Sequence, residues 1–220
     1  KTAYITVVDT FVTDYDNNTY KVVKIGEQYW MAENLKTTHY ADGTPLVDGT
    51  GVGSTEDDFT TKYYFAYNDD ENNVGIYGRL YTWAAAMNGA ASSNTNPSGV
   101  QGVCPDNWHV PSKSEWEELV NYLGGTEIAG GKLKSTGYDF WNYPNTAASN
   151  ESGFNALPGG RRGLQNDSYI NSISNFWSSY QTSYHTANGV ELLFDNASFK
   201  SIDSFGKEVG MSIRCVRDSQ

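Results

Sequence analysis

The sequence predicts an α+β protein, because two amphipathic helical stretches interrupt a chain that otherwise consists of short strand-like runs and long polar loops. The 220 residues include 22 Gly and 16 Tyr but only 3 Met. Such a composition is typical of short strands joined by ordered loops, as in secreted or surface proteins. No internal repeat and no linker divides the chain, so we expect one domain over residues 1–220.

The strands are expected at the two ends of the chain. Segment 4–31 carries β-branched and aromatic runs broken by turn-forming residues, and strands are predicted at 20–25 and 28–31. Four more segments with strand character lie near the carboxyl terminus: 175–180, 189–195, 198–203 and 209–218.

The first predicted helix spans residues 78–89. Leu80, Trp83, Ala84 and Met87 follow the spacing of one helix face, and Gly89 supplies the end. We expect Trp83 to serve the core.

The second predicted helix starts after Ser112, whose side chain can cap the first turn together with Glu115. The glycine pair 124–125 ends it. Its apolar face comprises Trp116, Leu119, Val120 and Leu123. Residues 126 to about 175 then lack periodicity, and an irregular stretch of this length tends to be functional.

The charge balance excludes some partners. Lys and Arg number 15 and Asp and Glu number 26, giving a net charge of −11. This sign opposes binding to nucleic acid or to an anionic membrane surface. No apolar run approaches the ~20 residues needed to cross a bilayer. We therefore expect no nucleic-acid partner and no membrane span.

An acidic turn is a candidate cation site. The segment "NDDENN" at 68–73 concentrates carboxylate and amide oxygens, and Asp69, Asp70 and Asn73 are its candidate ligands. Calcium prefers such oxygen ligands, so calcium is a possible cofactor and no other cofactor is expected. The alternative is a solvated acidic turn.

Aromatic residues in the irregular region are the candidate ligand-binding residues, because they lie among Asn, Ser and Gly. They are Trp141, Tyr143, Tyr169, Tyr180 and Tyr184. Rings beside amides and hydroxyls suit glycans, and the same chemistry serves protein interfaces. The alternative is that the rings hold a loop that lacks a core of its own.

The adjacent Arg161 and Arg162 are further candidates. They either pair internally with carboxylates or face an acidic group of a ligand.

Seven ordered blocks spread over residues 14–218 resemble the Fibrobacter succinogenes major paralogous domain, a module of surface and secreted proteins in Bacteroidetes and Fibrobacter. The blocks are "YKVVKIGEQYWMAENLKT", "YGRLYTWAAA", "CPDNWHVPSKSEWEELVNYLGG", "GGKLKSTG", "WNYPNTAASNESGFNALPGGRR", "FWSSY" and "MSIRCVRD". The resemblance implies an extracellular or outer-surface location, with a lipid anchor as one option. It also implies a C-type-lectin-like fold, shared with formylglycine-generating enzymes, with two helices, a long irregular loop region and a small, mostly antiparallel sheet.

The chain has two cysteines, Cys104 and Cys215. Formylglycine-generating enzymes use two cysteines a few residues apart in the closing region, whereas the block "SIRCVRD" holds one. An even number of cysteines in a surface protein favours a disulfide. The alternatives are a thiolate nucleophile or a copper-binding pair.

From these features we expect an exported bacterial surface module that recognises a glycan or protein partner without catalysis, as in adhesion. The alternative is a structural or assembly subunit of a surface appendage. An enzyme of unknown type is the third option.

Overall fold

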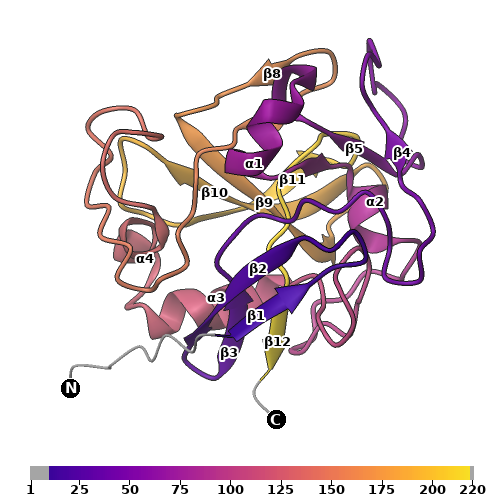
Figure 1. The fold of residues 1–220 in the computed structure, drawn as a ribbon. Helices are drawn as coiled ribbons and strands as arrows, with labels where there is room; N and C mark the ends of the chain where they lie inside the picture. Colours follow the sequence, from indigo (N-terminus) through magenta and orange to yellow (C-terminus); the bar gives the residue numbers. More distant parts are fainter. Residues whose placement is uncertain (1–9, 219–220) are drawn as a thin grey trace.

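The protein, described by a computed structural model over residues 10–218, is α+β and is built around two antiparallel sheets (Figure 1). One sheet has the order β1-β2-β3-β12 and the other has the order β11-β10-β9. Their strands are β1 Thr10–Thr13, β2 Thr19–Ile25, β3 Gln28–Met31, β9 Ile173–Gln181, β10 Thr186–Leu193, β11 Lys200–Gly206 and β12 Val216–Asp218. Because Val216 of β12 pairs with Trp30 of β3, the end of the chain returns to the amino-terminal sheet.

Two smaller sheets lie on the opposite side of the molecule from β1–β3 (Figure 1). One has the order β4-β5-β6, and the other consists of β7 and β8. Their strands are β4 Val47–Asp48, β5 Tyr63–Phe65, β6 Leu80–Tyr81, β7 Arg161–Arg162 and β8 Asp167–Ser168.

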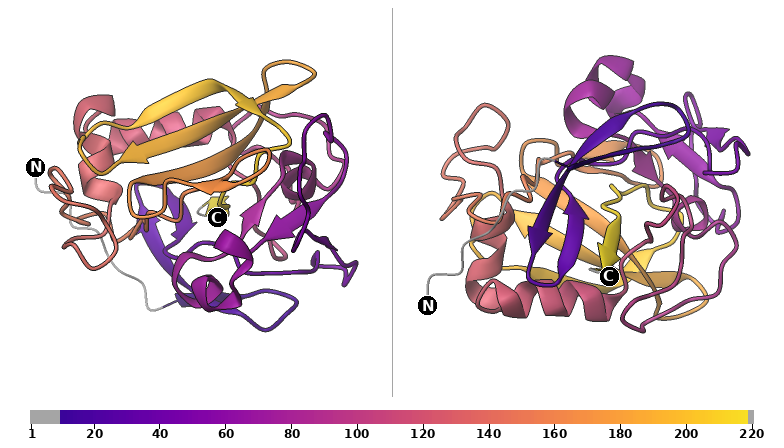
Figure 2. Two further views of the ribbon diagram at one scale, coloured as in Figure 1. Left: turned by 90° about the horizontal axis from the view of Figure 1, so that it is seen from above. Right: turned by 60° about the horizontal axis from the view of Figure 1, so that its bottom comes forward.

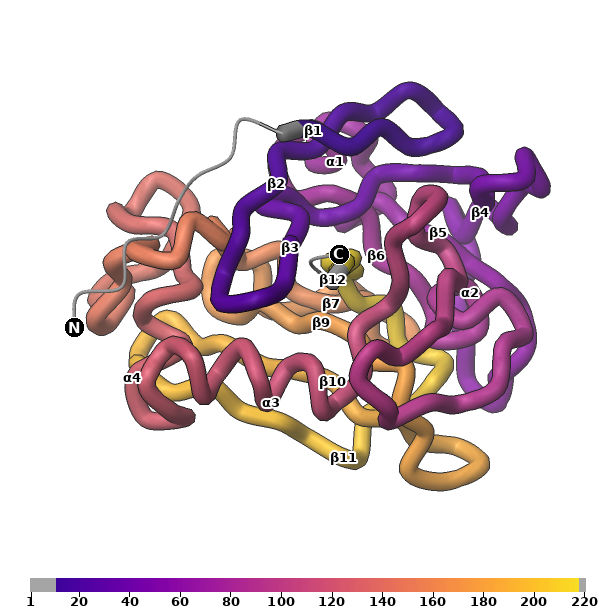
Figure 3. Tube along the Cα trace, turned by 90° about the horizontal axis from the view of Figure 1, so that it is seen from below, coloured from indigo at the N-terminus to yellow at the C-terminus, as the bar shows by residue number. Residues whose placement is uncertain are grey.

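The described chain has four α-helices, which are α1 Val74–Tyr77, α2 Trp83–Met87, α3 Lys113–Tyr122 and α4 Thr126–Leu133. The predicted capping box of α3 is confirmed, because the Ser112 hydroxyl accepts from the Glu115 amide and the Glu115 carboxylate accepts from the Ser112 amide. Figure 2 and Figure 3 show α3 running alongside the β9–β11 sheet. Trp116 of α3 packs there on Phe176 of β9, with ring centroids 5.7 Å apart.

The predicted helix at 78–89 is wrong in its first half. Leu80 and Tyr81 form strand β6 against β5, and only Trp83–Met87 is helical. The Thr82 hydroxyl accepts from the Ala85 amide and so starts the helix at residue 83. Gly78 has φ 74°, and a Cβ there would lie 2.6 Å from the Asn34 Cβ, so the chain turns sharply before β6.

Helix α4 lies in the region that we predicted to be irregular. Its sequence "TEIAGGKL" has two central glycines, which disfavour a helix on propensity alone. Tertiary packing overrides this preference, because a Cβ at Gly130 would lie 2.2 Å from the Ser198 carbonyl oxygen. The glycine allows the 197–198 backbone to approach the helix closely.

The carboxyl-terminal strands differ from the prediction mainly at 209–218. Only Val216–Asp218 is a regular strand, whereas Gly210, Met211 and Ser212 form isolated bridges to other parts of the chain. The predicted extended segment 4–31 includes residues 4–9, which lie outside the described part of the chain.

Strands β2 and β9 are buried on both faces. Neighbouring side chains of a strand point to opposite sides, and Phe176 and Trp177 accordingly belong to different apolar clusters. The same holds for Val22 and Val23 of β2. Apolar cores therefore lie on both sides of these strands.

Within residues 10–218, the fully buried cations without an ion pair to a carboxylate are Arg214 and Lys134. Arg214 donates to the Asn34 side-chain oxygen at 2.6 Å and to the backbone oxygens of Met31, Phe154 and Asn155. Desolvation lowers the pKa of this guanidinium, which nevertheless stays charged at neutral pH. The residue joins the amino-terminal segment to the loop at 154–155.

Lys134 acts similarly at the end of α4. Its ammonium donates to the carbonyl oxygens of Thr146, Leu193 and Asn196 at 3.0, 2.8 and 2.8 Å. An ammonium has three N–H donors, so all of them are used. Desolvation lowers the pKa of Lys134 to about 8. The charge holds the loop at Thr146 to the turn at 193–196 that follows β10.

The predicted disulfide is confirmed, since Cys104 and Cys215 are bonded to each other with Cα atoms 5.9 Å apart. No helix among residues 10–218 is long and apolar enough to cross a membrane.

Candidate functional site

An aromatic-walled cavity of about 300 Å³ lies between helix α2, the hairpin loop 182–185 that joins β9 to β10, and the loop 57–62. We call it the aromatic pocket. The residues that line it are Phe59, Thr60, Lys62, Trp83, Ala84, Met87, Gly89, Ala90, Gln181, Tyr184 and Lys207. Apolar walls with a few convergent polar groups are typical of ligand sites.

Trp83 forms the wall on the α2 side. It is the first residue of α2, and its ring nitrogen donates to the Ser178 carbonyl of β9 at 3.0 Å. Its backbone amide donates to the Lys207 carbonyl at 2.9 Å. The first hydrogen bond orients the indole and the second positions the backbone of Trp83, which is 8% exposed.

Phe59 and Tyr184 form the facing rim. Their ring centroids are 6.3 Å apart with 60° between the ring planes, and the His185 ring centroid lies 4.8 Å from that of Phe59. Tyr184 is 71% exposed, so most of its ring is available to a ligand.

The loop that carries Phe59 is ordered by the Asp58 carboxylate, which accepts from the backbone amides of Thr60 and Thr61. Although partial desolvation by itself raises the pKa of Asp58, these hydrogen bonds lower it below its usual value. The carboxylate is therefore ionised over the physiological range and keeps the loop in place.

Lys207 provides the floor of the pocket. Only 5% of its surface is exposed, and its ammonium donates to the Gln181 side-chain oxygen at 2.7 Å and the Tyr184 carbonyl at 2.8 Å. The ammonium also lies 4.5 Å from the centre of the Trp83 ring. Desolvation lowers the pKa of Lys207.

A second lysine, Lys62, lies at the rim. It donates to the Asn88 side-chain oxygen at 2.8 Å and lies 5.4 Å from the centre of the Tyr40 ring. Within residues 10–218, neither Lys62 nor Lys207 is in an ion pair.

Of the predicted aromatic residues, Tyr184 is the one that lines this pocket. The prediction for Trp141 needs correction, because its ring is only 1% exposed. Its ring nitrogen donates to the Ser135 hydroxyl and the Ala156 carbonyl, both at 3.1 Å. Trp141 is a core residue that anchors the irregular loop.

The other predicted residues lie elsewhere. Tyr143 is 78% exposed and packs against Tyr138, with ring centroids 5.6 Å apart. Tyr169 lies under the Arg161 guanidinium at 4.8 Å. Tyr180 is half-buried on β9. The predicted set does not form one surface.

Arg162 pairs internally. It is 6% exposed, donates to the Val52 carbonyl at 2.6 Å and lies 3.6 Å from the Asp167 carboxylate. Desolvation raises the pKa of Asp167, although Arg162 and a hydrogen bond from the Asn68 amide lower it.

The acidic turn at 68–73 uses its polar groups locally. Asp69 accepts from the Gly51 amide, Asp70 accepts from the Asn72 amide, and the Asn73 side chain donates to the Tyr67 carbonyl. Over the described part of the chain, no group of three or more His, Cys, Asp or Glu residues is placed to hold a metal ion. The geometry matches a hydrogen-bonded turn.

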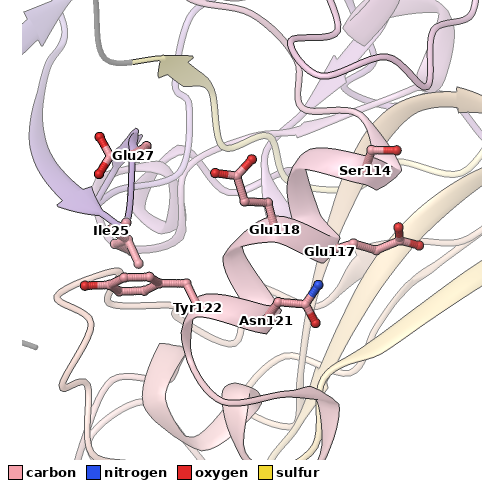
Figure 4. A pocket seen from close by; sticks show the side chains of 8 residues that line it. Ile25, Glu27, Ser114, Glu117, Glu118, Asn121 and Tyr122 are labelled. Carbon is pink, nitrogen blue, oxygen red and sulfur yellow. The ribbon is translucent and has the colours of Figure 1, made fainter. Parts of the chain in front are cut away.

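A second hollow, of about 500 Å³, lies between α3 and the β2–β3 turn (Figure 4). Figure 4 shows Glu118 and Tyr122 on the side of α3 nearer this turn, whereas Glu117 points away. The Glu118 carboxylate accepts from the Asn96 side chain. Glu27 also lines the hollow. The carboxylates around the hollow therefore disfavour an anionic ligand.

Sequence reasoning missed Phe59, Gln181 and Lys207 as pocket residues, and Trp83 was expected in the core. The four come from segments far apart in the chain, and no local spacing relates them, so no signal in the sequence pointed to them as a group.

The chain belongs to the Fibrobacter succinogenes major domain family, whose model matches residues 23–217. A search of the curated proteins found no match, and neither did a search of the solved structures.

Proposed function

We propose that the protein is an exported bacterial surface module that binds a glycan without catalysis, and that the aromatic pocket is the binding site. The observation that carries this proposal is the exposed ring of Tyr184, which lines the same cavity as Trp83 and the side-chain amide of Gln181. A sugar presents an apolar C–H face and a hydroxyl edge. Aromatic walls take the face, and fixed polar groups take the hydroxyls.

The rigidity of the pocket supports binding. The Trp83 indole donates one hydrogen bond to Ser178 of β9, and the Trp83 backbone amide donates another to the Lys207 carbonyl. The Phe59 loop is held by Asp58. A preformed site avoids the entropy cost of ordering side chains when a ligand binds.

The disulfide between Cys104 and Cys215 supports export, because disulfides persist in oxidising compartments outside the cytosol. On this ground we place the protein outside the cell or on the outer surface, with a lipid anchor as one means of attachment.

We also propose that the architecture is C-type-lectin-like. Two features support it: the closing strand β12 pairs with β3 near the start of the chain, and a long irregular excursion separates α4 from β9. A comparison of an experimental structure with that fold class would test this assignment.

The function is tested by screening a glycan array and then measuring affinity for a hit by isothermal titration calorimetry. Tyr184→Ala should weaken binding at least about fivefold, since stacking on an aromatic ring contributes on the order of 1 kcal/mol. Because Tyr184 is exposed, the thermal unfolding midpoint should change little.

Tyr143→Ala is the matched control, since it removes an equally exposed tyrosine outside the pocket. It should leave the affinity unchanged. If Tyr143→Ala abolished binding and Tyr184→Ala did not, the site would be the Tyr138–Tyr143 surface instead.

That surface favours the second candidate function, an assembly subunit, because two adjacent exposed tyrosines are typical of protein interfaces. Self-association in analytical ultracentrifugation that Tyr143→Ala removes would support this alternative.

A further inference from the structure

The two buried lysines of the fold differ in one respect that bears on the ligand. Lys134 directs all three N–H donors to backbone carbonyls and is a structural cation. Lys207 has two oxygen acceptors, both neutral. Its third N–H has no oxygen acceptor within residues 10–218, and the residue lines the aromatic pocket.

A buried charge without a counter-ion is costly. Lysines are almost never fully buried unless they are paired, and Lys207 is neither exposed nor paired with a carboxylate. A ligand that brings a negative group to Lys207 would complete its hydrogen bonds and supply the missing charge.

The other charged residue that lines the pocket has the same positive charge as Lys207. Lys62 lies at the rim of the pocket without an ion pair, and no Asp or Glu occurs among the lining residues that the structure describes. The whole chain carries a net charge of −11. Charges farther away than about 8 Å are largely screened at physiological ionic strength. The Asp58 carboxylate accepts from the amide of the lining residue Thr60 and adds one negative charge behind the Phe59 loop, whereas the charged side chains that line the pocket itself are the two lysines.

Resting on the proposed glycan function, we propose that the aromatic pocket selects an anionic sugar. The sugar ring lies against Trp83 and Tyr184, and its carboxylate or sulfate group is held by Lys207 with Lys62 at the rim. An ammonium is a compact point charge that suits either anion.

The test compares three oligosaccharides of one length by isothermal titration calorimetry: an oligogalacturonate, a sulfated galactose oligomer and a neutral galactose oligomer. The wild-type protein should bind at least one anionic oligomer at least about fivefold more tightly than the neutral one, which corresponds to a screened charge pair. Raising the salt to about 0.5 M should reduce the part of that preference that Lys62 contributes at the rim and leave most of the part that the buried Lys207 contributes, because buried charge pairs are screened much less.

Lys207→Met keeps the stem of the side chain and removes its charge, and Lys62→Gln removes the charge at the rim. Each should lower affinity for the anionic oligomer by a larger factor than that for the neutral one, so the preference for the anion should shrink. Lys62→Gln provides the test if Lys207→Met does not fold. Lys200→Gln is the control, since Lys200 lies on β11 outside the pocket, and it should change neither affinity.

The outcomes separate the two proposals. Equal or tighter binding of the neutral oligomer would overturn the anionic selectivity and leave glycan binding in place. Equal affinities for the two anionic oligomers, both higher than that for the neutral one, would still support the anionic selectivity. Failure of every glycan on the array and of all three oligomers to bind would remove both proposals.

Discussion

Cys104 and Cys215 are bonded to each other across 111 residues of sequence and tie the loop before α3 to the residue before β12. Both are fully buried in the same apolar cluster as Trp83 and Trp177. The disulfide therefore connects the segment that enters α3 to the segment that enters the last strand, β12. It also uses both cysteines of the sequence, so neither remains as a thiol nucleophile.

Removing the disulfide should strongly destabilise the fold. The double variant Cys104→Ala with Cys215→Ala should lower the free energy of unfolding by up to about 4–5 kcal/mol, because the unfolded chain regains the freedom of a long loop. Guanidinium chloride denaturation of the oxidised wild type and the double variant measures this difference. A loss below about 1 kcal/mol would contradict the clamping role.

Arg214→Lys should destabilise the protein by at least about 1–3 kcal/mol, because lysine lacks the planar fork that serves several acceptors at once. Those acceptors, which include the Met31 and Asn155 carbonyls, would lose partners inside the core. The control Arg217→Lys alters a half-buried arginine three positions later and should cost less than about 0.5 kcal/mol. Equal losses in chemical denaturation of the two variants would contradict the assigned role.

The stability should rise with pH in the range from about 8 to 9.5. Desolvation lowers the pKa of Lys134 from 10.5 to about 8, so in this range the unfolded chain binds more protons than the folded chain. The free energy of unfolding increases with pH under that condition. Above pH 10 the trend reverses, because tyrosines such as Tyr40, whose pKa desolvation raises, ionise first in the unfolded chain.

Lys134→Met isolates this effect. The variant should be less stable at pH 7, since three carbonyls lose their donor, and it should show a smaller rise between pH 8 and 9.5. Lys207 and Arg214 account for a remaining rise, as desolvation also lowers their pKa values. Urea denaturation at several pH values provides the slopes, and identical slopes for variant and wild type would contradict the assignment.

Gly130→Ala should destabilise the protein by about 1–3 kcal/mol, because the new Cβ would overlap the Ser198 carbonyl oxygen. The matched control is Gly75→Ala in α1, where a Cβ meets nothing within 4 Å. That change should be neutral or stabilise by up to about 1 kcal/mol, since it lowers the entropy of the unfolded chain. Thermal unfolding of both variants measures this difference, and equal unfolding midpoints for the two variants would contradict the close contact at Gly130.

The sequence by itself determined the elements with strong local signals. The capping box at Ser112 and Glu115 and the apolar stripe led to α3, and the β-branched and aromatic runs led to β2, β3 and the three strands of the β9–β11 sheet. The family and the disulfide also followed, because ordered blocks and two cysteines are visible without coordinates. These features depend on neighbours in the chain or on simple composition.

The tertiary structure alone decided what required distant segments to meet. Helix α4 exists because Gly130 permits a close backbone contact, although its propensity is poor. Trp141 proved to be a core residue, since Ser135 and Ala156 surround its ring nitrogen. Phe59, Trp83, Tyr184 and Lys207 come from four separate segments, and only the crossing of those segments makes them one pocket. Sequence periodicity does not predict this pocket, because the side chains are brought together by packing between elements. Their spacing along the chain plays no part.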